Sequence, residues 1–200
     1  MRHLAILLGG ALALAACSSS TPPPPPAPPP AVDLSNPLMA PGYMAMASSG
    51  DQFEIASGQL AQQVSQNPAV RNFGALLVAD HTRTSQMLAA AAQSAGLTAP
   101  APALLPDDQA ALDQLRAAGT GPSFDVAFKN AQIAAHQKAL QLHQNYAANG
   151  DVPALRNVAS QAVPIIQMHL NQAQMLNVAP PAPPPPPPAA PASSSAGERG

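Results

Sequence analysis

The sequence predicts an all-α protein, a four-helix bundle with a short extra helix in the connection between the second and third long helices. Charged residues make up 9% and aromatic residues 3% of the 200 residues, and the β-branched and aromatic runs typical of strands are scarce. Of the 26 prolines, eight lie within residues 22–30 and nine within residues 180–191. About 140 residues between these tracts are left for one domain of ordinary size.

The first two long helices form the first predicted hairpin. Apolar side chains recur at helical spacing over residues 44–65, which predicts the first helix. Asn67 is a typical N-cap residue, and proline is favoured at the first helical position that follows. The second helix is therefore expected to begin at Pro68 and to end near Ala95, before Gly96.

The other helices follow a loop over residues 98–106 that prolines interrupt. Pro164 lies inside the last predicted helix and is expected to kink it. Two hairpins with short loops, joined by a long connection, resemble the ferritin-like bundle. The short helix is expected from Asp107 to near Gly119, the third long helix from Ser123 to about Ala148, and the fourth from Asp151 to about Asn177, each with its first residue as the N-cap.

The N-terminus is predicted to be a lipoprotein signal peptide over residues 1–16. Its apolar stretch is too short to span a bilayer, which needs about 20 residues. The sequence Leu14-Ala15-Ala16-Cys17 resembles the bacterial lipobox, in which cleavage leaves the cysteine as a lipidated first residue. Cys17 is the only cysteine, and lipidation accounts for it without a disulfide. Because Ser18 follows it, we expect an outer-membrane lipoprotein that faces the periplasm of a Gram-negative bacterium.

The flanking segments are predicted to be spacers outside the folded domain. Residues 17–37 carry the lipidated cysteine and a Pro-rich tether, and residues 179–200 form a disordered Pro-rich tail. The four-helix domain is expected over residues 38–178. Eight Lys and Arg against ten Asp and Glu give a net charge of −2, which argues against binding nucleic acid through a basic surface.

Three histidines are predicted to lie among apolar residues of their helices. At about 100° per residue, His136 and His143 fall within the apolar arc of the third long helix. His169 falls within the apolar arc of the fourth. On the second helix, Asp80 and His81 lie on the two flanks of the apolar stripe.

The heights of these side chains along the bundle predict one polar cluster. Counted from the turn between the first two helices, Glu54 lies about 3–5 Å in height from Asp80 and His81. Counted from the last turn, His169 lies about 7 Å in height from His136. His143 is about 10 Å from His136 and is expected outside the cluster. The predicted cluster consists of Glu54, Asp80, His81, His136 and His169.

The motifs around these residues resemble a known bacterial family. They are Phe53-Glu54-Ile55, Asp80-His81, Phe124-Asp125, Ala135-His136 and Met168-His169-Leu170. Together they resemble the family called domain of unknown function 4142, over about Met44 to Asn177. The resemblance implies an exported, ferritin-like four-helix domain and a location in the cell envelope. It implies no characterised activity.

The cluster has two interpretations that the sequence leaves open. Imidazoles and carboxylates on facing helices could hold one transition metal, such as Zn, Fe or Cu. The alternative is buried hydrogen-bonded pairs that fix the helix register. Classical di-iron chemistry is not expected, since the Glu-x-x-His motif is absent: the residues three before the histidines are Val78, Ile133 and Ile166.

Two functions follow from these observations. The first is a non-enzymatic envelope lipoprotein, anchored by its lipid, that acts in envelope maintenance or stress through contacts with envelope proteins. No catalytic constellation is complete, which favours a role other than catalysis. The alternative is a metal-binding ferritin-like protein in oxidative stress or metal sequestration, with the predicted cluster as its site.

Overall fold

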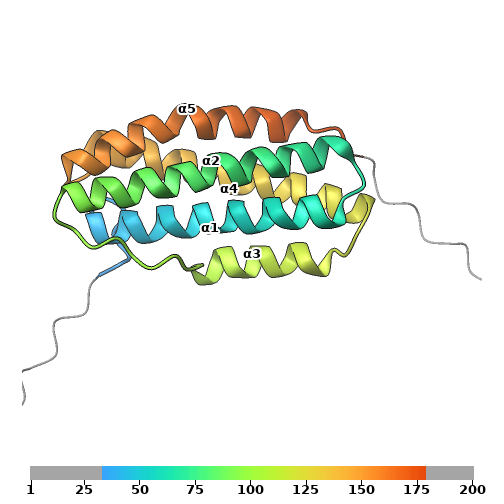
Figure 1. Ribbon diagram of the computed structural model, residues 1–200, viewed down its shortest axis with the longest axis horizontal. Coiled ribbons are helices and arrows are strands. Elements are labelled where there is room, and N and C mark those ends of the chain that lie inside the picture. Colours follow the sequence, from blue (N-terminus) through green and yellow to red (C-terminus); the bar gives the residue numbers. More distant parts are fainter. Residues whose placement is uncertain (1–32, 179–200) are drawn as a thin grey trace, which may run out of the picture. The chain divides into compact units, whose positions relative to one another are not determined.

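The computed structural model describes residues 33–178, and all regular structure within this range is helical. Five helices follow one another, and four of them are long, so the predicted all-α four-helix bundle with one short extra helix is confirmed (Figure 1). No helix in the described range is long and apolar enough to cross a membrane. The helices are α1 (Ala40–Val64), α2 (Pro68–Ser94), α3 (Pro106–Ala117), α4 (Pro122–Asn149) and α5 (Pro153–Met175).

The predicted signal peptide (residues 1–16), Cys17, most of the tether over 17–37 and the tail over 179–200 lie outside the described residues.

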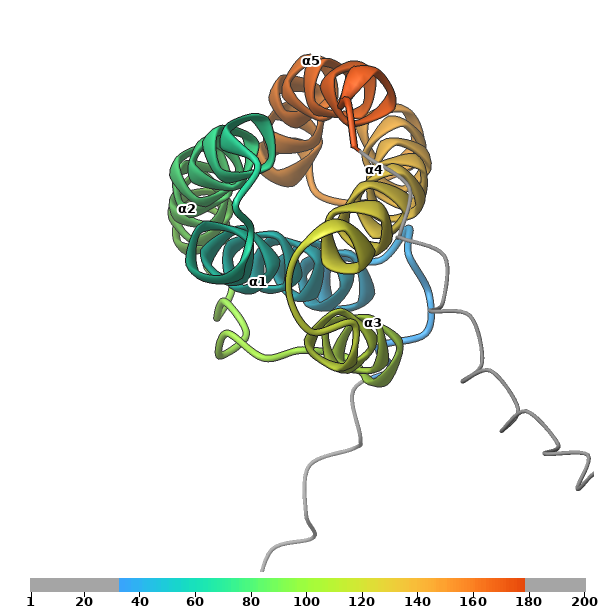
Figure 2. The same cartoon turned by 90° about the vertical axis from the view of Figure 1, so that its right-hand side faces the viewer.

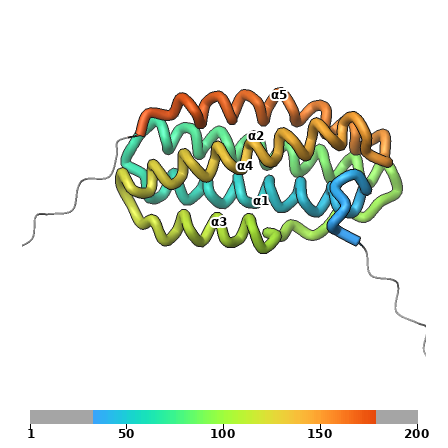
Figure 3. The backbone as a smooth tube through the Cα atoms, turned by 180° about the vertical axis from the view of Figure 1, so that it is seen from behind, coloured from blue at the N-terminus to red at the C-terminus, as the bar shows by residue number. Residues whose placement is uncertain are grey.

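The four long helices surround a common axis, and α3 lies outside them (Figure 2). Neighbouring pairs are α1 with α2, α4 with α5, α2 with α5, and α1 with α4. The chain between α2 and α4 runs back along the bundle, so that α2 and α4 point the same way (Figure 1). Figure 3 shows from behind that α3, which belongs to this connection, runs alongside α1 and α4. The long connection between two short-loop hairpins is the predicted ferritin-like arrangement.

Proline lies in the first two positions of every described helix, and only one of the five helices has a side-chain cap as well. Each of the five has proline at its first or second position, where the missing N–H has no intrahelical partner to lose. The Asn67 cap is confirmed, since its side chain accepts from the backbone N–H of Ala69 at 2.9 Å. The caps predicted at Asp107, Ser123 and Asp151 are wrong. The N-cap residues there are Leu105, Gly121 and Val152, and none makes a side-chain cap hydrogen bond.

The first helix begins at Ala40, four residues before the predicted start. Ala40, Tyr43, Met44 and Ala47 are all buried, so the helical spacing of the core face continues to the new N-terminus. Tyr43 stacks on Tyr146 of α4 with ring centroids 3.7 Å apart. This aromatic pair fixes the extra turn of α1 to the end of α4.

The core consists of two apolar clusters with a polar layer between them. One cluster is built around Phe53, Phe73, Leu77, Phe124 and Phe128. The other surrounds Tyr43, Met44, Leu88, Tyr146 and Leu155. Along each long helix the two clusters are separated by buried polar or charged residues. The residues of this layer include Asp51, Glu54, Ser57, Asp80, His81, Thr84, Gln132, His136 and His169.

Candidate metal centre

Three histidines from three helices meet in the polar layer. They are His81 of α2, His136 of α4 and His169 of α5, here called the His triad. Each ring offers one nitrogen as a metal ligand, and these three nitrogens lie within 4.8 Å of one another. The ring centroids are 5.3–5.8 Å apart, and no member is more than 5% exposed. Residues that are 33 or more positions apart in the sequence thus form one compact group of imidazoles.

Each ring of the His triad is oriented by a hydrogen bond at one of its two nitrogens. The partner is in every case a carboxylate or a backbone carbonyl oxygen, which can only accept, so the ring nitrogen must be the donor. In the neutral ring this fixes the tautomer and leaves a lone pair on the other nitrogen. The bonds run from His81 Nδ1 to Asp51 Oδ1 (2.7 Å), from His136 Nδ1 to the Gln132 carbonyl (2.8 Å) and from His169 Nε2 to Asp80 Oδ2 (2.9 Å).

The second nitrogen of each ring has no hydrogen-bond partner. Within residues 33–178, five buried side-chain atoms lack a partner, and all five belong to the polar layer. A buried polar atom without a partner costs about 1–3 kcal/mol, so five in one place call for an explanation. The atoms are His81 Nε2, His136 Nε2, His169 Nδ1, Glu54 Oε2 and Gln132 Oε1.

The two supporting aspartates are themselves held in place. Asp51 accepts hydrogen bonds from the hydroxyls of Thr84 (2.8 Å) and Ser85 (2.9 Å) on α2. The Arg83 guanidinium donates a hydrogen bond of 2.8 Å to Asp80 Oδ1, whereas His169 bonds to the other oxygen, Oδ2. A metal-binding imidazole commonly donates its other N–H to a carboxylate or a carbonyl, and this outer contact orients the ring. All three members of the His triad have this arrangement.

Glu54 lies beside the His triad but is not part of it. Its Oε1 is 3.6 Å from Nδ1 of His136, and its Oε2 has no hydrogen-bond partner. Burial raises the pKa of Glu54 to about 8. The neighbouring Gln132 side chain donates to Ser57 Oγ at 2.9 Å, and its interaction with Glu54 opposes part of this rise in pKa.

The electrostatic surroundings favour neutral imidazoles in two of the three positions. Burial lowers the pKa of His136 to about 3, and the positive charge that His81 can carry adds to the effect. Burial and His81 likewise lower the pKa of His169. Burial also opposes a charge on His81, but its hydrogen bond to Asp51 and the carboxylates of Glu54 and Asp80 raise its pKa overall. A metal ion requires the neutral form of all three.

The structure brings together all five residues of the predicted cluster, but in two roles. The histidines form the centre, and the carboxylates lie behind or beside them: Asp80 bonds to His169, and Glu54 lies next to His136. The hydrogen-bonded pairs of the alternative interpretation are therefore present too, and they use only one nitrogen of each ring. His143 lies outside the triad, as predicted, where Nδ1 is 3.0 Å from the Tyr43 hydroxyl. Cys17 lies outside the described residues.

Sequence reasoning missed Asp51 and Gln132. Asp51 precedes Glu54 by three residues, which places both on one face of α1, so the helical spacing could have indicated it. Gln132 acts through its backbone carbonyl four residues before His136, a contact that no side-chain pattern reports.

The donor set fits a transition-metal ion. Zinc and copper bind imidazole nitrogen at about 2.0–2.1 Å, which requires nitrogens roughly 3.4 Å apart around a tetrahedral ion. The nitrogens of the His triad lie within 4.8 Å of one another, so they would have to approach further to reach this value. An ion there would also supply the missing partners of three of the five unpaired atoms.

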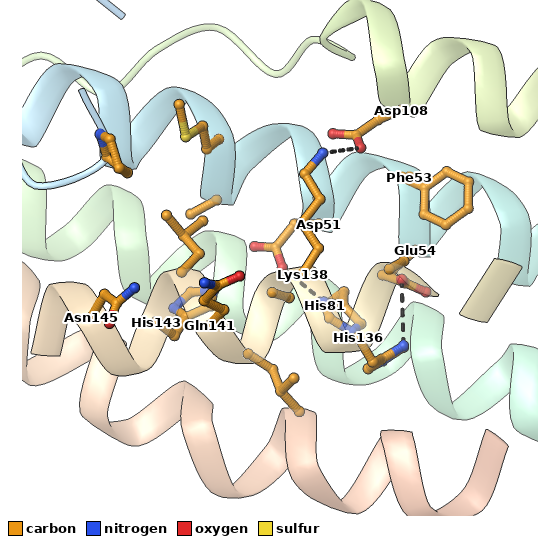
Figure 4. A pocket seen from close by; sticks show the side chains of 18 residues that line it. Asp51, Phe53, Glu54, His81, Asp108, His136, Lys138, Gln141, His143 and Asn145 are labelled. Carbon is orange, nitrogen blue, oxygen red and sulfur yellow. Dashed lines mark hydrogen bonds and ion pairs between the residues drawn. The ribbon is translucent and has the colours of Figure 1, made fainter. Parts of the chain in front are cut away.

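A cavity of about 330 Å³ adjoins the His triad, between α1 and α4. His81, His136, Asp51 and Glu54 lie toward one end of it, and His143 lies toward the other (Figure 4). At its side, Lys138 of α4 pairs with Asp108 of α3 at 3.0 Å. The remaining wall is mostly apolar.

Residues 23–176 match the family described as "Domain of unknown function (DUF4142)". The chain belongs to the DUF4142 family. The match covers more than three quarters of the sequence and confirms the resemblance that its motifs predicted. No curated protein matches this DUF4142 protein in sequence.

Two solved structures share the fold of this DUF4142 domain. One is "CopM in the Cu(II)-bound form", with 18% sequence identity and a TM-score of 0.57. The other is "CopM in the Ag-bound form (by co-crystallization)", with 19% identity and a TM-score of 0.55. Each alignment covers 68% of this chain, and 94% and 93% of the respective CopM chains. At this identity the likeness concerns the fold.

Proposed function

We propose that this protein binds one transition-metal ion at the His triad. The observation that carries the proposal is the convergence of three buried imidazoles, each with one nitrogen hydrogen-bonded and the other without a partner. If the rings served only the packing of the bundle, each of the three unpaired nitrogens would carry the cost of a buried polar atom without a partner. A bound cation offsets it.

Copper and zinc are the ions that this donor set suits best. Neutral imidazole is a borderline ligand that both ions accept, and among divalent ions Cu(II) binds nitrogen sites most tightly. The two CopM structures with Cu(II) and with Ag support a copper ion, since they have the same fold. Of the two functions predicted from the sequence, the geometry therefore favours metal sequestration over a role through protein contacts alone.

We propose in addition that binding takes place in the cell envelope. The support is the lipobox-like sequence at Leu14–Cys17, which would anchor the domain at the outer membrane facing the periplasm. Envelope proteins would then be its neighbours. Membrane fractionation of the protein and of Cys17→Ser is the test, and equal distribution of both in the soluble fraction would contradict the anchor.

The test of metal binding is a Cu(II) titration of the full chain carrying Cys17→Ser, which removes its only thiol. We expect one equivalent to bind, with the electron paramagnetic resonance spectrum of nitrogen ligation. His169→Gln should lower the affinity at least tenfold, while thermal unfolding shows that the variant is folded.

The matched control is His143→Gln, a change to a buried histidine on α4 that lies outside the triad. It should retain one equivalent with unchanged affinity. If the protein binds no ion, or binds it equally well without His169, the His triad is a packing feature and the proposal is wrong.

A further inference from the structure

His143 presents one ring nitrogen to the cavity between α1 and α4. The residue lines the cavity toward the end away from the His triad and is 9% exposed (Figure 4). Its Nδ1 lies 3.0 Å from the Tyr43 hydroxyl, and within residues 33–178 no protein atom bonds to its Nε2. Nε2 is nevertheless not one of the five buried atoms without a partner. It therefore has accessible surface, which the unpaired nitrogens of the His triad do not have.

The Tyr43 hydroxyl determines that Nε2 carries the hydrogen. Tyr43 is fully buried, and among the described residues its hydroxyl bonds to His143 alone. Burial raises the pKa of Tyr43, so the hydroxyl keeps its hydrogen, which has no acceptor other than Nδ1. Burial also lowers the pKa of His143 to about 4, which keeps the ring neutral. A neutral ring that accepts at Nδ1 carries its hydrogen on Nε2, so His143 offers a hydrogen-bond donor to the cavity.

The charged groups of the cavity wall already have partners. Asp51 accepts hydrogen bonds from three side chains of α2, and Asp108 pairs with Lys138 at 3.0 Å. Burial raises the pKa of Glu54 to about 8, so this residue is mostly a neutral acid at neutral pH. Within the described chain, the wall thus keeps no unpaired charge that would offset the cost of burying an ion, which favours a neutral ligand.

The size and the apolar part of the wall define the rest of the ligand. The volume of about 330 Å³ is within the range of small-molecule sites, where apolar contacts bind the ligand and a few polar groups orient it. The rings of Phe53 and His143 lie in the wall, and aromatic rings pack favourably against one another. The apolar side chains of the wall include Met46, Ala47, Phe53, Ala139, Leu142 and Ile166.

We propose that this cavity binds a small neutral molecule that carries an aromatic ring and a carbonyl group, whose oxygen accepts a hydrogen bond from Nε2 of His143. The proposal does not depend on the metal site, because His143 lies outside the His triad. Acetophenone has both features. α-Methylstyrene has the same shape but a methylene group in place of the carbonyl oxygen, and benzoate has a second, charged oxygen in place of the methyl group. The site is expected to distinguish these probes.

The experiment uses the full chain with Cys17→Ser in the presence of a chelator, so that the His triad is free of metal. Isothermal titration calorimetry gives the dissociation constants of acetophenone and α-methylstyrene, whose ratio separates the hydrogen bond from apolar contact. His143→Leu removes the donor and leaves the carbonyl oxygen unpaired, so this ratio should move against acetophenone by about fivefold or more. Thermal unfolding shows whether the variant is folded. Benzoate should bind more weakly than acetophenone, because its charge finds no partner.

A spectroscopic measurement tests the donor directly. In protein labelled with nitrogen-15 at histidine, the chemical shifts of the two ring nitrogens show which of them carries the hydrogen. We expect the hydrogen of His143 on Nε2, and the Nε2 resonance should shift when acetophenone binds. The resonances that disappear in His143→Gln assign the ring.

A second variant tests the location. Ala139→Leu adds side-chain volume to the wall of the cavity and should weaken acetophenone binding at least tenfold. The matched control is Ala148→Leu, an exposed position on the same helix outside the cavity, which should leave acetophenone binding unchanged.

The proposal is wrong if acetophenone does not bind, if benzoate binds more tightly than acetophenone, or if folded His143→Leu leaves the ratio unchanged. It is equally wrong if His143 carries its hydrogen on Nδ1, or if Ala139→Leu and Ala148→Leu have the same effect. These last two results decide the matter even if His143→Leu does not fold. All of the measurements use metal-free protein, so their failure leaves the metal site unaffected, and a failed Cu(II) titration leaves this site unaffected.

Discussion

The carboxylate of Asp51 on α1 accepts a hydrogen bond from Nδ1 of His81 on α2 at 2.7 Å, with both side chains buried. The contact joins the two helices of the first hairpin at the level of the His triad. It also fixes which nitrogen of His81 carries the proton, so that Nε2 keeps its lone pair. A residue outside the His triad thus determines how one of its imidazoles is presented.

Asp51→Ala should weaken metal binding although Asp51 is not expected to be a ligand. Outer contacts of this kind typically account for 10–100-fold in affinity, and we expect a loss in that range, measured by competition with a chelator. Asp107→Ala, at an exposed carboxylate in the first turn of α3, is the control for the lost charge and should show no such loss. Equal affinities for all three proteins would show that the orientation of His81 does not matter.

Metal affinity should fall as the pH falls, and His81 should determine the pH at which the affinity falls. Its pKa is raised above the usual value of 6.5, so a proton competes with the ion at His81 at a higher pH than at His136 or His169, whose pKa values are lowered. Removing Asp51 takes away the leading cause of the rise, and the drop in affinity should then move to lower pH. The check is a set of Cu(II) titrations between about pH 5 and 8. A pH dependence identical in the wild type and Asp51→Ala would contradict this assignment.

Glu54→Gln should stabilise the metal-free protein at high pH. The pKa of Glu54 rises from 4.5 to about 8 on folding, so its contribution to stability is fully present below pH 4.5 and is lost as the pH rises through 8. Glutamine does not ionise, and the variant should gain at least about 1 kcal/mol over the wild type at pH 8.5, but not at pH 4.5. Urea unfolding at the two pH values measures the difference, in which the contributions of the histidines cancel. A gain of the same size at both pH values would point to packing rather than ionisation.

The crossing of α1 and α2 depends on two glycines. A Cβ added at Gly58 would lie 2.5 Å from the carbonyl oxygen of Gly74, and one added at Gly74 would lie 2.6 Å from that of Gly58. The clash is with backbone, which cannot rotate away, so Gly58→Ala should destabilise the fold by about 1–3 kcal/mol or more. Gly50→Ala is the control on the same helix, where nothing lies within 4 Å. It should stabilise by roughly 0.5–1 kcal/mol, as alanine does in a helix. Similar melting curves for the two variants would refute the close crossing.

The sequence was sufficient for the fold and for the histidines of the site, because both follow from helical periodicity. His136 and His169 lie in the apolar arcs of their helices, and a buried position on a bundle helix faces the common axis. Heights counted from the turns placed these two residues within about 7 Å of each other along the bundle axis.

The roles of the carboxylates could not be derived in this way. Periodicity gives the face of a helix on which Glu54 and Asp80 lie, but the atom that Asp80 contacts depends on side-chain torsions and on the tautomer of His169. The predicted caps were wrong for a similar reason. Asp151 is a residue type that often caps helices, but its carboxylate accepts a hydrogen bond from the Tyr146 hydroxyl at 2.8 Å. The helix begins instead at Pro153.

If the His triad binds an ion as proposed, its division between the two hairpins would link metal loading to maturation of the protein. His81 belongs to the hairpin of α1 and α2, whereas His136 and His169 belong to that of α4 and α5. A chain in which only one hairpin has formed presents at most two of the three imidazoles and competes poorly for the ion. Once the hairpins dock, a bound ion would cross-link them and resist their separation, by an amount that grows with its affinity for the docked form over the separated one. The ion would therefore distinguish mature from immature chains, and only mature ones would carry it.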